Sequence, residues 1–217
     1  LILVKDLTKN LINKKRGYKM NLIHISKMSG KLKGIPSINT NTLTNKFCQK
    51  MFNSSKENLI CRSCYSYEML QTFRKNCIPK FEQNSKVLSE AIIPELYLPK
   101  INASFFRFSA HGELINKNHL INLMNLTLKN PHTTFTLWTK KKSLVISYCK
   151  KYGKPENLIL IYSNKIVGSI AKLPEYFDKT FNNVLKKDSS VNCFQKCIDC
   201  LLCYTKNDTE TIIEVKK

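Results

Sequence analysis

The sequence lacks the features that mark membrane, secreted and repeat proteins. No run of about 18 or more apolar residues occurs in the 217-residue chain, so no membrane span is expected. The beginning of the chain, Leu1–Asp6, has no long apolar core and no small-residue cleavage site, and therefore does not resemble a signal peptide. No internal repeat or long low-complexity stretch is evident. These absences favour a single domain over residues 1–217, located in the cytoplasm.

Acidic residues and arginine are scarce beside lysine. The chain has 36 Lys and Arg residues against 15 Asp and Glu residues, which gives a net charge of +21. Basic side chains neutralise phosphates, so nucleic acid is a candidate partner. Only four of the basic residues are arginine, the better reader of bases, and the lysines are mostly scattered. An AT-rich genome, which favours Lys, Asn and Ile codons, is the alternative explanation of this composition.

Cysteine, by contrast, is abundant and clustered. There are nine cysteines; four lie in one C-x3-C-x2-C-x2-C run near the end of the chain, and three more precede residue 65. Clustered thiols without an export signal favour metal binding over disulfides. Zinc sites usually separate two pairs of cysteines by a dozen or more residues, so the compact run favours an iron–sulfur cluster, with structural zinc as the alternative. The candidate metal ligands are Cys48, Cys61, Cys64, Cys193, Cys197, Cys200 and Cys203.

Two arrangements of these seven thiols fit the sequence. They could hold two centres, one for each group, or a single centre that draws ligands from both groups and joins the ends of the chain. The first group supplies only three thiolates, so a four-iron cluster there would keep one iron open for a substrate or cofactor. Cys77 and Cys149 lie in helical contexts and are expected to be ordinary thiols.

The middle of the chain alternates between strand and helix. Short apolar runs predict strands, and amphipathic runs between them predict helices, an order that indicates parallel pairing through right-handed crossovers. The expected strands are 104–109, 133–139 and 158–163, and the expected helices are 116–129 and 143–152. The first of these helices is expected to carry Leu120, Leu123, Met124 and Leu128 on one face.

The flanking regions carry weaker patterns. Residues 1–20 are Lys- and Asn-rich and predict a basic N-terminal arm, and residues 190–217 form a cysteine-rich C-terminal segment. Alternation predicts a strand over 21–26. A helical run to about Cys77 follows the segment Cys61–Ser66, and a second helical stretch covers 82–98.

Polar side chains follow each of the three predicted strands. Ligands of parallel α/β folds bind at the carboxyl ends of strands, so these side chains are candidates for one shared pocket. They are Ser109, His111, Glu113, Thr139, Lys140, Ser163 and Asn164, of which Glu113 and Lys140 are the catalytic candidates and the others, with Glu113, are candidates for cofactor binding. Each also has a structural explanation: Glu113 as a helix-start residue, Thr139 as a cap and Ser163 as the start of a turn.

Several of these elements together resemble the phage "gene product 88" family. The resemblance rests on the order and spacing of Cys48, Cys61-x2-Cys64-Tyr65, the segment 106–114, the segment 130–140 and the cysteine-rich end. The chain departs from that family by having His111-Gly112-Glu113 where Gly-Asp is usual, and Trp138 where Tyr is common. The resemblance implies a phage or mobile-element origin, and hence the cytoplasm of an infected or host cell. It implies little about activity.

A second resemblance is to the radical S-adenosylmethionine superfamily. Cys193-x3-Cys197-x2-Cys200 has the C-x3-C-x2-C spacing of that superfamily, and Cys61-x2-Cys64-Tyr65 resembles the second half of the same motif. That motif normally lies early, after the first strand, whereas the C-terminal run lies at the end of this chain. The resemblance therefore places an open-site cluster on the first group of cysteines and makes the C-terminal group an auxiliary or shared site.

The same resemblance assigns a role to Glu113. His111-Gly112-Glu113 resembles the superfamily's Gly-Gly-Glu segment, which contacts the amino group of the cofactor. It implies that Glu113 contacts the methionine moiety of S-adenosylmethionine.

We therefore expect an α/β fold: a shortened, partial parallel β/α barrel like that of radical S-adenosylmethionine enzymes, with cysteine-rich N- and C-terminal extensions. A full eight-stranded barrel needs about 250 residues, which exceeds this chain. The expected function is that of an iron–sulfur enzyme with one or two 4Fe-4S clusters, using S-adenosylmethionine on a small-molecule or macromolecular substrate. The alternative is a basic module that binds nucleic acid and in which a structural zinc ion or iron–sulfur cluster holds the ends of the chain together.

Overall fold

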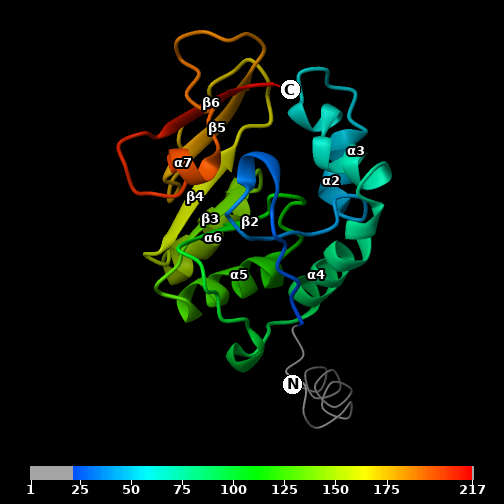
Figure 1. Ribbon diagram of the computed structural model, residues 1–217, viewed down its shortest axis with the longest axis vertical. Helices are drawn as coiled ribbons and strands as arrows, with labels where there is room; N and C mark the ends of the chain where they lie inside the picture. Colours follow the sequence, from blue (N-terminus) through cyan, green and yellow to red (C-terminus); the bar gives the residue numbers. More distant parts are fainter. Residues whose placement is uncertain (1–21, 217) are drawn as a thin grey trace.

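A single parallel sheet organises the fold. The computed structural model describes residues 22–216, and the predicted basic arm over 1–20 lies outside them (Figure 1). The sheet has six strands, all pairs are parallel, and their order in the sheet follows their order in the chain. The α/β class is thereby confirmed. The strands are β1 (Ser37–Ile38), β2 (Phe105–Phe108), β3 (Thr134–Thr139), β4 (Leu158–Ser163), β5 (Lys179–Val184) and β6 (Thr211–Val215).

Helices and short 3-10 turns connect these strands. The α-helices are α2 (Lys46–Phe52), α3 (Tyr65–Gln71), α4 (Ile78–Glu90), α5 (Lys117–Lys129), α6 (Lys142–Tyr152) and α7 (Cys197–Cys200). The 3-10 turns are η1 (Gly30–Leu32), η2 (Ile60–Ser63), η3 (Lys75–Cys77) and η4 (Glu95–Tyr97). No helix within residues 22–216 is long and apolar enough to cross a bilayer.

The three central strands and the two helices between them confirm the sequence prediction, whereas the earlier elements differ from it. The strand expected over 21–26 is wrong for its described part, because only Ser26 forms an isolated bridge there, to Ser37. The helix expected over 82–98 ends at Glu90, before Pro94. It ends there because the Asn122 side chain accepts a hydrogen bond from the Ile93 amide and donates one to the Ala91 carbonyl, which leaves the chain extended.

The helical run expected between Ser66 and about Cys77 is interrupted: α3 ends at Gln71, and after Thr72 only the 3-10 turn η3 follows. Before α3, the 3-10 turn η2 covers Ile60–Ser63, and Cys64 has extended backbone angles. The two cysteines of this segment, Cys61 and Cys64, therefore do not lie on a continuous helix.

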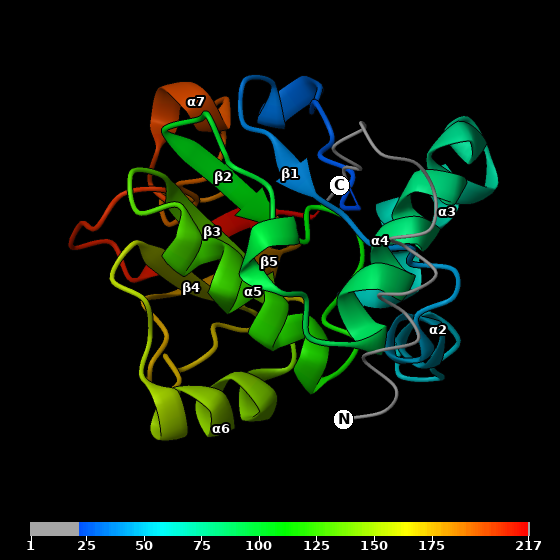
Figure 2. The ribbon, with the colours of Figure 1, turned by 90° about the horizontal axis from the view of Figure 1, so that it is seen from below.

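The strand order places the crossover helices on one face of the sheet. Right-handed crossovers between successive parallel neighbours all fall on the same side when the strands follow chain order. In Figure 2, α5 and α6 lie together on one side of the sheet and α7 lies on the other. We call the face that α5 and α6 cover the outer face of the sheet, and the face on which α7 lies the inner face (Figure 2).

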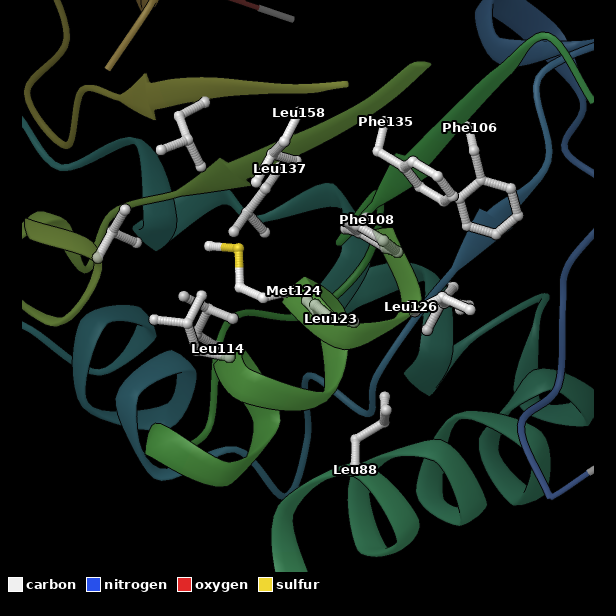
Figure 3. Packing of buried hydrophobic residues seen from close by; sticks show 14 of the residues in the cluster. Leu88, Phe106, Phe108, Leu114, Leu123, Met124, Leu126, Phe135, Leu137 and Leu158 are labelled. Atoms are coloured by element: carbon white, nitrogen blue, oxygen red, sulfur yellow. The ribbon is translucent and has the colours of Figure 1, made fainter. Parts of the chain in front are cut away.

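The outer face holds the main hydrophobic core. Alternate strand residues such as Phe106, Phe135 and Leu137 pack against one side of α5, and Leu88 of α4 closes the cluster behind it (Figure 3). Leu120, Leu123 and Met124 are fully buried there, as predicted. Leu128, which was expected on the same face, is 61% exposed.

The inner face is covered by a second, smaller cluster. The sheet contributes Ile159, Ile161 and Phe181 to this cluster. Cys203 and Tyr204 of the C-terminal segment pack over them, as does Ile35 near the beginning of the described chain. Gly34 approaches Ile198 of α7, which joins the two covering segments. Part of the predicted cysteine-rich segment 190–217 thus lies against the sheet, and β6 belongs to the sheet itself.

We predict that Leu123→Ala lowers the free energy of unfolding by about 2–5 kcal/mol, because it leaves a cavity between α5 and the sheet. Urea denaturation measures the change. Leu128→Ala, the same substitution on the exposed side of the same helix, is the control and should change the stability by less than about 0.5 kcal/mol. Equal losses in both variants would contradict the assignment of the core face.

Candidate functional site

Glu113 is the centre of the polar groups at the carboxyl ends of the strands. It is only 4% exposed. Its Oε1 atom accepts hydrogen bonds from the Thr139 hydroxyl at 2.5 Å and from the Leu114 amide at 2.8 Å, and its Oε2 atom accepts one from the Lys140 amide at 2.8 Å. A carboxylate can accept about four hydrogen bonds, so Glu113 retains capacity for a further donor.

Lys140 joins the end of β3 to the end of β4. Its Nζ atom donates to the Ser163 hydroxyl at 3.1 Å. Burial disfavours its charge, but the Cys61 sulfur and the Glu113 carboxylate outweigh that effect and raise the pKa of Lys140. The three strand ends predicted from the sequence thus meet, and Glu113, Thr139, Lys140 and Ser163 form one hydrogen-bonded group.

Helix α2 brings Cys48 to this group. Asn45 caps the helix, because its Oδ1 atom accepts hydrogen bonds from the amides of Phe47 at 3.0 Å and Cys48 at 3.2 Å. The Nδ2 atom of the same Asn45 donates to the Glu113 carbonyl at 2.9 Å. One side chain therefore fixes the beginning of the Cys48 helix relative to Glu113.

Backbone pairing brings Cys61 to the same edge. The Ile60 amide donates to the Lys165 carbonyl at 3.0 Å, and Leu59 forms an antiparallel bridge with Ile166 just after β4. Cys64 follows and precedes α3, and the stacked rings of Phe52 and Tyr67, with centroids 3.9 Å apart, join α3 to α2.

The three cysteines share one electrostatic environment. Burial, followed by the Glu113 carboxylate and the Cys64 sulfur, raises the pKa of Cys48. Burial also raises the pKa of Cys61, against the opposing charge of Lys140. Nucleophilic cysteines need a lowered pKa, so this environment disfavours a catalytic thiol. A metal bound here would have to displace the protons of these thiols, so its binding would strengthen as the pH rises.

The sulfurs are not arranged for a single ion. Within residues 22–216, no three His, Cys, Asp or Glu side chains form a group tight enough to hold one metal ion. Cys48, Cys61 and Cys64 influence one another's charge at this edge of the sheet without forming such a group.

Two further predicted site residues, Asn164 and Ser109, form hydrogen bonds with neighbouring segments of the chain. Asn164 donates to Asn182 and to Ser169, which fixes the loop after β4. Ser109 has a φ of 58° at the end of β2, and its amide donates to the Ile38 carbonyl. These hydrogen bonds fix the backbone just after β4 and at the end of β2.

His111 connects the end of β2 to α3. Its Nδ1 atom lies 3.0 Å from the Ser66 hydroxyl, and its ring stacks with Phe81 at 5.6 Å between centroids. Burial, with smaller contributions from Arg107 and Arg74, lowers the pKa of His111 to about 4, so the ring is neutral at pH 7. His111 packs against α3, the helix that follows Cys64.

The C-terminal cysteines form a separate group on the inner face. The Lys31 ammonium donates to the Cys193 sulfur at 3.1 Å and forms an ion pair with Glu214 at 2.7 Å. Burial raises the pKa of Cys203 to about 12, and the next largest influence is Cys193. A hollow open to solvent is lined by Lys31, Cys193, Cys197, Cys200, Cys203 and Tyr204, among others.

The two cysteine groups have different neighbours. Cys193 contributes to the raised pKa of Cys197 and of Cys203. The pKa values of Cys48 and Cys61 are instead influenced by the charge of Lys140. The two groups of cysteines therefore have separate surroundings in the fold.

Two supporting residues were missed in the sequence analysis. Asn45 caps α2 and donates a hydrogen bond to the Glu113 carbonyl. Lys31 donates a hydrogen bond to the Cys193 sulfur and forms an ion pair with Glu214. Asn before a helical run is a recognisable cap signal, but its second partner lies 68 residues away. The sequence around Lys31 gives no indication of this role, because its partners lie 162 and 183 residues away in the chain.

Comparison with known proteins identifies no relative: no protein-family model, curated protein or solved structure matches this chain.

We predict that Gly112→Ala lowers the free energy of unfolding more than Gly153→Ala does. Both glycines have positive φ, 87° and 78°, so each substitution should cost about 1–3 kcal/mol from strain. A Cβ at Gly112 would also lie 2.6 Å from the Thr40 carbonyl oxygen, whereas nothing lies within 4 Å of one at Gly153. Overpacking should add about 1–3 kcal/mol at Gly112. Urea denaturation compares the two, and equal losses would contradict this close approach.

We predict that stability declines as the pH falls below about 6.5, in part through His119. This side chain is 1% exposed, and its Nδ1 atom accepts a hydrogen bond from the Ile115 amide, which follows the Glu113 loop. Burial, with Lys141 contributing, lowers the pKa of His119 to about 3. Between pH 6.5 and that value the unfolded chain binds a proton that the folded chain does not, so folding stability is lost.

His119→Gln should reduce the loss of unfolding free energy between pH 7.5 and 4.5 by about 2 kcal/mol. His132→Gln, which removes an exposed imidazole, is the control. Urea denaturation at both pH values gives the comparison, and an unchanged pH dependence in His119→Gln would show that this imidazole does not cause the effect.

Proposed function

We propose that this protein is an iron–sulfur enzyme related in mechanism to radical S-adenosylmethionine enzymes. The observation that carries the proposal is that Asn45 ties the Cys48 helix to Glu113 at the carboxyl ends of the strands, where Cys48 and Cys61 share the electrostatic influence of Lys140 and Glu113. Ligand sites of parallel β/α folds lie at this edge. A cluster held there by three thiolates would supply one-electron chemistry at an iron left open for S-adenosylmethionine.

The fold supports this proposal through its strand order. Six parallel strands in chain order, with helices on one face, are what a partial β/α barrel requires. We propose that the sheet is such a partial barrel, with its concave side at the inner face. The C-terminal segment then closes the open side, and substrate enters from the edge that carries Glu113.

The chain's own residues have defined tasks in this proposal. Glu113 is held by Thr139 and by two backbone amides, so its carboxylate is oriented before a ligand arrives and can accept a hydrogen bond from the amino group of the cofactor. The charge of the Lys140 ammonium acts on Cys48 and Cys61, so it would offset the negative charge that these sulfurs acquire when they lose their protons. Ser163 holds that ammonium in place.

The C-terminal cysteines would hold a second, auxiliary centre. Four thiolates from Cys193, Cys197, Cys200 and Cys203 complete the ligand set of one cluster, and Lys31 donates a hydrogen bond to the first of them. Because this group joins α7 to the inner face, the centre would also fix the cover of the sheet.

We predict that Cys64→Ala removes the first centre and all activity, whereas Cys200→Ala removes the second. Iron, acid-labile sulfide and zinc per chain should be measured on protein purified without oxygen, together with an absorption spectrum. The native chain should contain about eight irons, and each variant about four. Adding S-adenosylmethionine to the reduced protein should change the spectrum of the native chain and of Cys200→Ala, but not that of Cys64→Ala.

Cys77→Ala is the matched control, because Cys77 lies in η3 and belongs to neither group. It should retain all the iron. A Cys64→Ala protein with full brown colour and function would rule out the proposal. Zinc without sulfide in the native protein would also overturn it and would favour a basic, zinc-stapled module that binds nucleic acid.

A further inference from the structure

Four polar side chains on the inner face have buried donor atoms without a partner. They are the Arg107 Nε, Thr136 Oγ1, Trp138 Nε1 and Tyr204 Oη atoms, none of which has a hydrogen-bond partner within residues 22–216. Thr136 is 0% exposed and Tyr204 is 1% exposed. Buried polar atoms in proteins are nearly always hydrogen-bonded, so four such atoms in one region indicate a missing partner.

These four side chains are neighbours. Arg107 of β2 is paired in register with Thr136 of β3, so both point to the same face of the sheet. The Arg107 Cζ atom lies 4.0 Å from the centroid of the Trp138 ring. The Tyr204 ring meets the edge of Phe105, which lies two residues before Arg107 on the same face of β2, with centroids 6.1 Å apart. Burial raises the pKa of Tyr204 to about 12, and the charge and hydrogen-bonding capacity of Arg107 act in the opposite direction.

The chemistry of the four groups defines what the missing partner must be. The Arg107 and Trp138 nitrogens can only donate, and the two hydroxyls can donate as well. No Asp or Glu of the described chain forms an ion pair with Arg107. The partner is therefore an acceptor, and the unpaired guanidinium favours an acceptor that carries negative charge.

We propose that Arg107, Thr136, Trp138 and Tyr204 bind the oxyanion group, a carboxylate or phosphate, of a small-molecule ligand. Arg107 and Trp138 are only half-buried, which gives such a group access. Lys140 directly follows β3, two residues after Trp138, and its amide donates to Glu113, so the carboxyl edge with Glu113 lies beyond Trp138 along this strand. Binding of the anion is independent of the proposed function, but its role as the anchor of a substrate rests on it.

The competing acceptor is a sulfur of the C-terminal centre. The charge of Arg107 acts on Cys197 and Cys203, so a thiolate there could attract it. That acceptor accounts for Arg107 and Tyr204 but not for Thr136 and Trp138, whose neighbours in the sheet are Arg107, Ile159 and Ile161. An oxyanion beside the guanidinium can accept from all four.

The chain contains its own reporter for this site. Trp138 is the only tryptophan, so intrinsic tryptophan fluorescence reports on the ring that stacks with Arg107. The full chain, with its metal content measured, should be titrated with inorganic phosphate and, separately, with malonate at constant ionic strength. We expect a saturable fluorescence change, confirmed by calorimetry, and the tighter of the two anions identifies the group that the site prefers.

Arg107→Gln should weaken binding about a hundredfold, while Arg74→Gln, the same substitution at an arginine that contacts Ser29, should leave it unchanged. Tyr204→Phe and Thr136→Val each remove one hydroxyl at nearly constant shape and should weaken binding about tenfold. These two variants test the site even where Arg107→Gln does not fold.

Three results would overturn the inference. The first is no saturable change with either anion, and the second is unchanged binding in Arg107→Gln. The third is loss of metal from Arg107→Gln without anion binding to the native chain, which would assign Arg107 to the C-terminal centre. Anion binding by a chain that holds no iron would support the inference and refute only the proposed iron–sulfur function.

Discussion

The structure depends on one topological constraint: six parallel strands that follow chain order. Right-handed crossovers then place α5 and α6 on the same face, so the opposite face needs another cover, and of the described helices only the short α7, in the β5–β6 connection, lies there (Figure 2). The chain covers that face with the segment around Ile35 and with the cysteine-rich segment that includes Cys203 and Tyr204. The C-terminal cysteines therefore lie where the topology requires a cover, and a metal centre among them would stabilise a short segment that has little core of its own.

The same constraint explains where the charges lie. Lys31, Arg107 and Lys140 are partly buried cations on the inner face or at its carboxyl edge, and only Lys31 has a carboxylate ion pair within the described chain. Protonated thiols do not offset these charges, but thiolates do. Burial, the largest influence on Cys48 and Cys203, keeps the pKa of both thiols high, so metal binding would release protons and place negative sulfur beside these cations.

The sequence predicted the parts of the fold whose signals are local. Strands β2, β3 and β4 are apolar runs, and their polar ends identified Glu113 and Lys140, because parallel strands bring their carboxyl ends together. Strand β5 was missed because it reads Lys-Thr-Phe-Asn-Asn-Val; its buried Lys179 is satisfied by Asn207 and by the Thr209 carbonyl, partners about 30 residues away. Strand β1 has only two residues, too few for any periodicity. Asn45, Lys31 and the environment of Arg107 likewise depend on distant contacts that no local pattern encodes.

Glu113 links the structural and the chemical roles of the carboxyl edge. Its carboxylate is fixed by β3 through Thr139 and Lys140, and its carbonyl is bonded to Asn45, which also caps the helix that carries Cys48. A displacement of Glu113 would therefore move a candidate metal ligand together with a candidate cofactor contact. Such a supporting shell of hydrogen bonds holds both groups in place before any ligand binds, which is the condition for a preorganised site. The rigidity of Glu113 and of the beginning of α2 thus comes from the sheet and from Asn45 rather than from the cysteines.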